Sequence, residues 1–127
     1  MGDCDVIFPW LLLKKANDGF KAIECLRTAG CRAGVVSITY VVCVNAARSV
    51  LAYDGYDCAP ATAFELFDKC CAGRFDAKVR ELFGTVCRYK YESEFNPLFG
   101  LADAELESLI SGVRAFYDDV EEYLRGK

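Results

Sequence analysis

An all-α fold is predicted for this 127-residue chain, as an up-and-down bundle of four longer helices with one additional short helix. Apolar residues recur every three or four positions through most of the sequence, which is the helical period, and no segment shows the period-two alternation of a half-buried strand. The turn signals between these segments are short, and short connections place successive helices antiparallel. We therefore expect a single domain over residues 1–127, with its core in about residues 10–125.

The first helix is predicted from an amphipathic pattern. Its apolar face is formed by Leu12, Ala16, Phe20, Ile23 and Leu26, while lysines and acidic residues occupy the other face. Gly30 follows this pattern, and glycine readily takes the left-handed conformation that ends helices. The first helix is therefore expected to end near residues 29–30.

Residues 32–53 form the second predicted helix, and they are apolar on nearly all sides. The segment is too long for a strand. Its uncharged part, Ala33–Ala47, is shorter than the roughly 20 residues that span a bilayer. We expect a buried central helix and no membrane interaction.

The boundaries of the remaining helices are predicted from capping residues. Thr62 and Glu65 have the spacing of a capping box at the start of a short helix that ends near residue 73. Asp76 is expected to cap the next helix, which Pro97 terminates. Asp103 is then expected to cap the long last helix.

Composition excludes several classes of function. The chain has no histidine, so Ser-His and Cys-His nucleophiles and imidazole metal ligands are absent. Its eight cysteines include no Cys-x-x-Cys pair, so we expect no zinc site, and nothing in the sequence calls for a cofactor. A net charge of −4 argues against binding DNA or RNA through bulk charge. The acidic first residues lack the features of a signal peptide, which predicts a cytoplasmic protein.

Three stretches carry a resemblance to a known family. Residues 40–57, YVVCVNAARSVLAYDGYD, are similar to the second helix of HEPN domains, with an aromatic start, an Ala-Ala-Arg run and a Gly-Tyr turn. Residues 88–95, RYKYESEF, resemble the arginine and the acidic-aromatic pair of that family. Residues 104–124 resemble its long closing helix. The likeness covers about residues 10–125.

This resemblance implies a four- to five-helix bundle that forms a homodimer and has a small nucleotidyltransferase as its partner, as in toxin-antitoxin pairs. Many HEPN proteins are metal-independent ribonucleases with an Arg-x4-6-His motif. In that chemistry the arginine stabilises the charge on the phosphate and the histidine moves the proton. Arg88 matches the arginine, but the residues four to seven after it are Glu92, Ser93, Glu94 and Phe95, and none of them is histidine.

Polar residues of the second helix are further candidates for binding a ligand. Ser37, Tyr40, Asn45 and Arg48 lie within an arc of about 140° on a helical wheel. They either face Arg88 across a shared pocket, or form a buried network, or line a dimer seam. These alternatives remain open because buried polar groups need partners in each case.

Aromatic residues follow Arg88 closely in the sequence. Tyr89, Tyr91, Phe95 and Phe99 either stack on nucleobases or pack the end of one helix against its neighbour.

Three functional hypotheses follow. The first is a non-catalytic binding protein that holds a nucleotide or RNA phosphate at Arg88 and Arg48. The second is a metal-independent ribonuclease that uses Arg88 with Glu92 or Glu94. The third is a purely structural dimerisation module, which the high hydrophobic fraction of 54% would serve.

Overall fold

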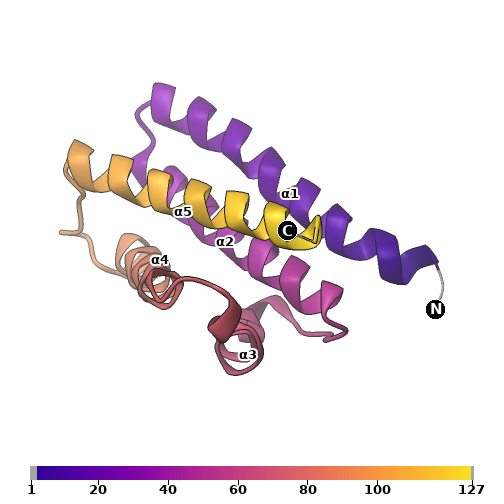
Figure 1. Cartoon of the computed structure of the whole chain (residues 1–127). Helices are drawn as coiled ribbons and strands as arrows, with labels where there is room; N and C mark the ends of the chain where they lie inside the picture. The colour runs from indigo at the N-terminus through magenta and orange to yellow at the C-terminus, as the bar shows by residue number, and fades with distance from the viewer. Residues whose placement is uncertain (1–2, 127) are drawn as a thin grey trace.

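The structure, a computed structural model, describes residues 3–126, without the side chains of residues 3–6 and Ala72. Five α-helices and no strand occur in this part of the chain (Figure 1): α1 (Asp3–Thr28), α2 (Arg32–Tyr53), α3 (Ala63–Cys70), α4 (Lys78–Phe95) and α5 (Asp103–Leu124). Short 3-10 turns at Pro60–Thr62 and Ala72–Arg74 flank α3. The prediction of four longer helices with one short helix between the second and the fourth is confirmed.

The helices α1, α2 and α5 lie side by side in Figure 1, and α1 and α2 run in opposite directions. In the same view α3 and α4 are seen nearly end-on, so their axes cross those of the other three helices. α4 therefore departs from a simple up-and-down bundle, in which it would run alongside its neighbours. This crossing leaves α4 in contact with α5 over only a short length.

The central helix is α2, which packs against α1, α3, α4 and α5. It is long and apolar enough to cross a membrane by length and composition, but most of it is buried in this fold. The prediction of a buried central helix is confirmed. Its bounds, Arg32–Tyr53, also match the predicted segment.

At Gly19, α1 and α2 pack tightly against each other. A Cβ atom at this position would overlap a methyl group of Val42 on α2. Ala16 and Ala46 are fully buried, which lets the two backbones come near to each other. Gly30, with φ of +77°, then ends α1 as predicted and turns the chain into α2.

A cluster of phenylalanine rings joins α3, α4 and α5. The Phe67 ring lies edge-to-face with the rings of Phe83, at 5.2 Å between centroids, and Phe116, at 5.7 Å. The Phe64 ring stacks on Phe83 at 4.2 Å. These contacts fix α4 across the bundle, because each ring buries a large apolar area.

Two of the predicted caps are wrong. Residues 60–62 form a 3-10 turn, so Thr62 is not extended and its hydroxyl donates back to the Ala59 carbonyl at 3.2 Å. Asp103 lies inside α5 and forms an ion pair with Arg32, while Glu105 accepts the Ala102 N–H at 3.1 Å.

The predicted cap at the start of α4 is borne out in part. Asp76 accepts the Lys78 N–H at 2.9 Å, although α4 starts two residues later than Asp76. The predicted end of α4 before Pro97 is confirmed, since its last residue is Phe95.

Candidate functional site

A groove of about 510 Å³ lies between α4 and the first half of α5. Three small residues of α5, Ala104, Ser108 and Gly112, repeat every fourth position along the groove. Because their side chains are short, the face of α5 that lines the groove leaves space beside α4. The remaining lining residues are Lys78, Glu81, Leu82, Thr85 and Tyr89 from α4 and Glu105 and Leu109 from α5. The volume falls within the range of roughly 300–1,000 Å³ that is usual for ligand sites.

Arg88 does not line this groove itself, but it neighbours two residues of α4 that do, Thr85 and Tyr89. It follows Thr85 by one helical turn, and its guanidinium carbon lies 5.1 Å from the centre of the Tyr89 ring. Its side chain is exposed, and no acidic residue in the described part of the chain pairs with it within 4.0 Å. Arg88 thus offers an available positive charge next to an aromatic ring that lines the groove.

The two carboxylates predicted as partners of Arg88 are engaged elsewhere. Glu92 accepts a hydrogen bond from the side-chain amide of Asn96 at 2.7 Å, which closes the end of α4. Glu94 forms an ion pair with Lys90 at 2.7 Å. Neither carboxylate lines the groove.

The aromatic residues near Arg88 fall into two pairs. Tyr89 packs against Phe99 with ring centres 5.7 Å apart, which holds the loop after α4 against the groove. Tyr91 and Phe95 contact each other at 5.0 Å and remain exposed on the surface of α4. The four aromatic residues that were grouped in the sequence analysis therefore form one packed pair and one exposed pair.

The contacts that the polar residues of α2 make are with residues other than Arg88. The Tyr40 ring contacts Phe64 on α3 at 5.8 Å, and the Lys90 ammonium lies over it at 5.1 Å. Arg48 lies near the Cys58 thiol in the connection between α2 and α3, and its positive charge opposes the rise that burial causes in the pKa of Cys58.

Asn45 is 9% exposed and Ser37 is half-buried. Among the described residues no hydrogen bond, ion pair or ring contact joins either of them, Tyr40 or Arg48 to Arg88. The hypothesis of one shared pocket for α2 and Arg88 therefore has no supporting contact.

A polar cluster at the other end of the molecule was not predicted from the sequence. Tyr123 and Arg74 both hydrogen-bond to the carboxylate of Asp54, and Arg74 donates to the Tyr123 hydroxyl at 2.9 Å. The Cys71 thiol donates to the same carboxylate at 3.5 Å. Cys71 and Arg74 are three residues apart, but Asp54 and Tyr123 come from distant parts of the chain, and no spacing in the sequence signals their meeting.

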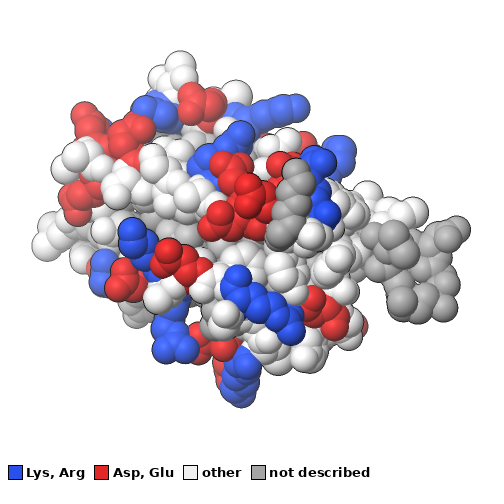
Figure 2. All heavy atoms as spheres, in the orientation of Figure 1, with Lys and Arg blue, Asp and Glu red and all other residues white. Residues whose placement is uncertain are grey.

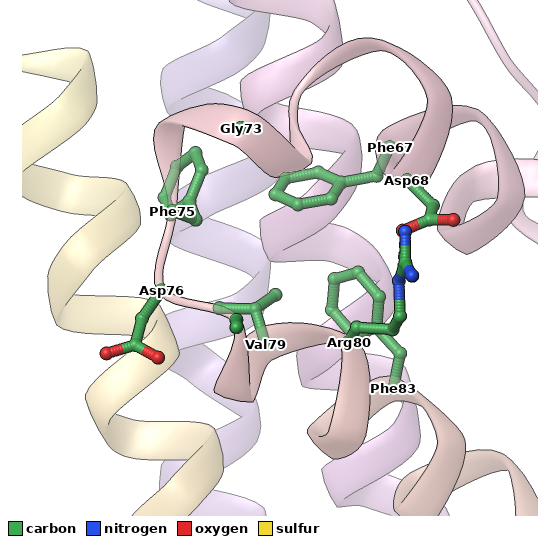
Figure 3. A pocket seen from close by; sticks show the side chains of 9 residues that line it. Phe67, Asp68, Gly73, Phe75, Asp76, Val79, Arg80 and Phe83 are labelled. Atoms are coloured by element: carbon green, nitrogen blue, oxygen red, sulfur yellow. Dashed lines mark hydrogen bonds and ion pairs between the residues drawn. The ribbon is translucent and has the colours of Figure 1, made fainter.

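A second cavity, of about 390 Å³, lies between α3 and the start of α4 (Figure 3). Its walls are the rings of Phe67, Phe75 and Phe83, and the Arg80 guanidinium reaches across one edge to the Asp68 carboxylate at 2.7 Å. The Asp76 carboxylate points away from the rings in this view. No charged group is directed between the rings, so this cavity has the character of a hydrophobic packing contact.

The described residues were compared with the side-chain groups that bind metal ions in proteins. Among the side chains that the structure describes, no three His, Cys, Asp or Glu residues come together in a group suited to hold a metal ion.

Comparison with protein-family models, with curated proteins and with solved structures finds no match to this chain. The resemblance to HEPN domains rests on residues 40–57, 88–95 and 104–124 alone.

Proposed function

We propose that this chain is a HEPN-like binding protein that holds a nucleotide, or a phosphate of single-stranded RNA, in the groove between α4 and α5. The observation that carries this proposal is the position of Arg88, whose unpaired guanidinium lies 5.1 Å from the centre of the Tyr89 ring, and Tyr89 lines the groove. Arg88 is also the residue that matches the arginine of the family motif. Arg48 is not part of this proposed site, because it contacts Cys58 elsewhere in the fold.

The groove offers the contacts that a nucleotide needs. A base can stack on Tyr89, since base–aromatic stacking contributes roughly 1–3 kcal/mol and tolerates any base. Arg88 suits a phosphate because its planar guanidinium donates two parallel hydrogen bonds. The hydroxyls of Thr85 and Ser108 are available to ribose or phosphate oxygens, and Lys78 adds a second positive charge further along α4.

Charge limits the size of the ligand. Glu81 and Glu105 also line the groove, and the chain carries a net charge of −4. Affinity from many phosphate contacts is therefore not expected, and binding should depend only weakly on salt. A mononucleotide or a short single strand fits these charges better than a duplex does.

Catalysis is not part of this proposal. The ribonuclease alternative needs a base that faces the phosphate at Arg88, whereas Glu92 is bonded to Asn96 and Glu94 to Lys90. The resemblance also implies a homodimer and a nucleotidyltransferase partner, and both stay predictions.

Titration of the protein with AMP and with a short single-stranded RNA, followed by calorimetry, tests the proposal. Arg88→Ala should weaken binding by about tenfold or more, because a charge-assisted hydrogen bond contributes roughly 1.5–3 kcal/mol. Arg80→Ala is the control, since Arg80 is an exposed arginine of the same helix that pairs with Asp68 at the cavity between α3 and α4. Its affinity should equal that of the wild type.

Two results would count against the proposal. One is the absence of binding at millimolar ligand, and the other is an Arg88→Ala variant that binds as the wild type does. RNA cleavage that the wild type performs and Arg88→Ala loses, with folding intact, would favour the ribonuclease alternative instead.

A further inference from the structure

The cavity of phenylalanine rings between α3 and α4, here called the aromatic cavity, shares a wall with a second cavity. Phe75 and Asp76 line both of them. The second cavity, of about 240 Å³, extends from this wall to Asp119 and Glu122 on α5, and we call it the acidic cavity. In Figure 3 the Asp76 carboxylate points away from the rings and towards α5, which is drawn in pale yellow. An apolar site and a negatively charged site therefore lie next to each other.

The aromatic cavity suits a flat aromatic group. Phe67 and Phe83 are 1% and 6% exposed, so two of its walls belong to the hydrophobic core. Their rings meet edge to face at 5.2 Å, which is a geometry that aromatic rings prefer. The volume of about 390 Å³ falls within the range of roughly 300–1,000 Å³ that is usual for small-molecule sites. The ring of a ligand would therefore complete a cluster that the fold leaves open on one side.

The carboxylates of the acidic cavity have no cationic partner. None of the ion pairs among the described residues includes Asp76, Asp119 or Glu122. Arg74 also lines this cavity, but its guanidinium pairs with the Asp54 carboxylate. Burial raises the pKa of Asp119, and the negative charge of Glu122 raises it further. A positive charge in the acidic cavity would relieve this repulsion.

An organic cation fits the acidic cavity better than a metal ion does. Acidic atoms gather over the second half of α5 (Figure 2), but no three acidic side chains among those described form a group suited to hold a metal ion. Metal ions require several oxygen ligands at fixed distances. An ammonium group requires only acceptors for its three N–H donors, and carboxylates supply them. An anion such as a nucleotide would instead be repelled here.

We propose that the two cavities together bind a small aromatic amine. Its ring packs against the phenylalanines of the aromatic cavity, and its ammonium group lies at Asp119 and Glu122. A flexible arm of a few carbon atoms joins the two groups across the shared wall of Phe75 and Asp76. None of the residues that line either cavity lines the groove between α4 and α5, so this site is separate from the one proposed for a nucleotide.

Phenylbutylamine is the probe, because it carries a phenyl ring and an ammonium group on a flexible arm. Butylamine lacks the ring and phenylbutanol lacks the charge, so these two compounds are its matched controls. Titration followed by two-dimensional NMR measures each dissociation constant and locates the ring through the amide signals of Gly73 and Val79, which line the aromatic cavity. Butylamine should bind at least about tenfold more weakly than the probe because it buries no ring. Phenylbutanol should bind about threefold to tenfold more weakly because it forms no ion pair.

A double variant, Asp119→Asn with Glu122→Gln, removes two charges and keeps the shape of the acidic cavity. It should bind phenylbutylamine about threefold to tenfold more weakly than the wild type does, and phenylbutanol equally well. Asp118→Asn is the matched control, because Asp118 is an exposed neighbour that pairs with Arg114 and lines neither cavity. This variant should bind the probe as the wild type does. Circular dichroism confirms that all variants are folded.

Three results would overturn the proposal. The first is the absence of shifts at Gly73 and Val79 with millimolar phenylbutylamine. The second is equal affinity for phenylbutylamine and phenylbutanol, which would make the aromatic cavity a site for any apolar molecule. The third is unchanged binding of the probe in the double variant, which would place the ammonium group elsewhere. Binding of AMP should be equal in the double variant and the wild type, so the groove proposal and this proposal fail separately.

Discussion

The Tyr123 hydroxyl, near the end of α5, donates a hydrogen bond at 2.8 Å to the carboxylate of Asp54, the residue that follows α2. The Asp54 side chain is only 12% exposed, and it also forms an ion pair with Arg74, which lies in the turn after α3. The Tyr123 ring also packs against Tyr53 and Phe75, at 5.6 and 5.4 Å between ring centres. One tyrosine thus joins the ends of α2 and α5 to the segment between α3 and α4.

Replacing Tyr123 with phenylalanine should destabilise the fold. The ring contacts stay, but the nearly buried Asp54 carboxylate loses a hydrogen-bond donor, which costs about 1–2 kcal/mol. Chemical denaturation measures the free energy of unfolding of both proteins. Tyr91→Phe is the control, because Tyr91 is 63% exposed and should be neutral. Equal stabilities of Tyr123→Phe and the wild type would mean that water replaces the hydroxyl.

Alkaline pH should reveal the same interaction. Burial raises the pKa of Tyr123, and the Asp54 carboxylate raises it further, from the ordinary value of about 10. The folded protein therefore holds this proton more tightly than the unfolded chain does. The resulting stability is complete below about pH 10 and is lost as pH rises through the raised value. The free energy of unfolding should fall less steeply above about pH 10 in Tyr123→Phe than in the wild type, and identical slopes would contradict this assignment.

Gly19→Ala should destabilise the pairing of α1 with α2. The added methyl group would overlap Val42, which is fully buried and cannot move into open space. Overpacking of this kind costs about 1–3 kcal/mol. Gly84→Ala is the matched control on α4, where a Cβ atom meets nothing within 4 Å. It should instead stabilise the helix by about 0.5–1 kcal/mol, because alanine favours helix more than glycine does.

Thermal and chemical denaturation of the two glycine variants compare them directly. A Gly19→Ala protein as stable as the wild type would show that α1 and α2 are further apart than the structure has them. A loss of stability in Gly84→Ala would point to an unrecognised contact on the exposed face of α4.

The bounds of α2, the ends of α1 and α4 and much of the core could be predicted from the sequence because they depend on local periodicity, whereas α3 ends at Cys70 and not near residue 73. Arg32–Tyr53 was predicted to its exact bounds, since its apolar pattern and the following turn are both local signals. The Thr62 and Asp103 caps were wrong because a 3-10 turn and a tertiary ion pair with Arg32 took precedence over local capping. Such competition between local and tertiary partners is not visible in residue spacing.

The candidate site was predicted only in part. Arg88 was identified through the family resemblance, but the groove beside it depends on the angle at which α4 crosses α5, and no local pattern encodes that angle. In the cluster around Asp54, the partner Tyr123 is 69 positions away in the sequence and the partner Arg74 is 20 positions away. From the sequence, Asp54 was therefore recognised only as part of the turn after the second helix, and its role in this cluster was not predicted.

The cysteines should differ sharply in reactivity. Cys43 and Cys71 are buried, and burial with the adjacent Asp54 raises the pKa of Cys71 to about 12. Cys25 and Cys31 are exposed. Because the thiolate is the reactive species, a maleimide at neutral pH should modify Cys25 and Cys31 first and leave Cys43 and Cys71 unmodified until the protein unfolds. Peptide mapping by mass spectrometry after timed labelling measures this order, and rapid labelling of Cys71 in the folded protein would show that the cluster around Asp54 opens readily.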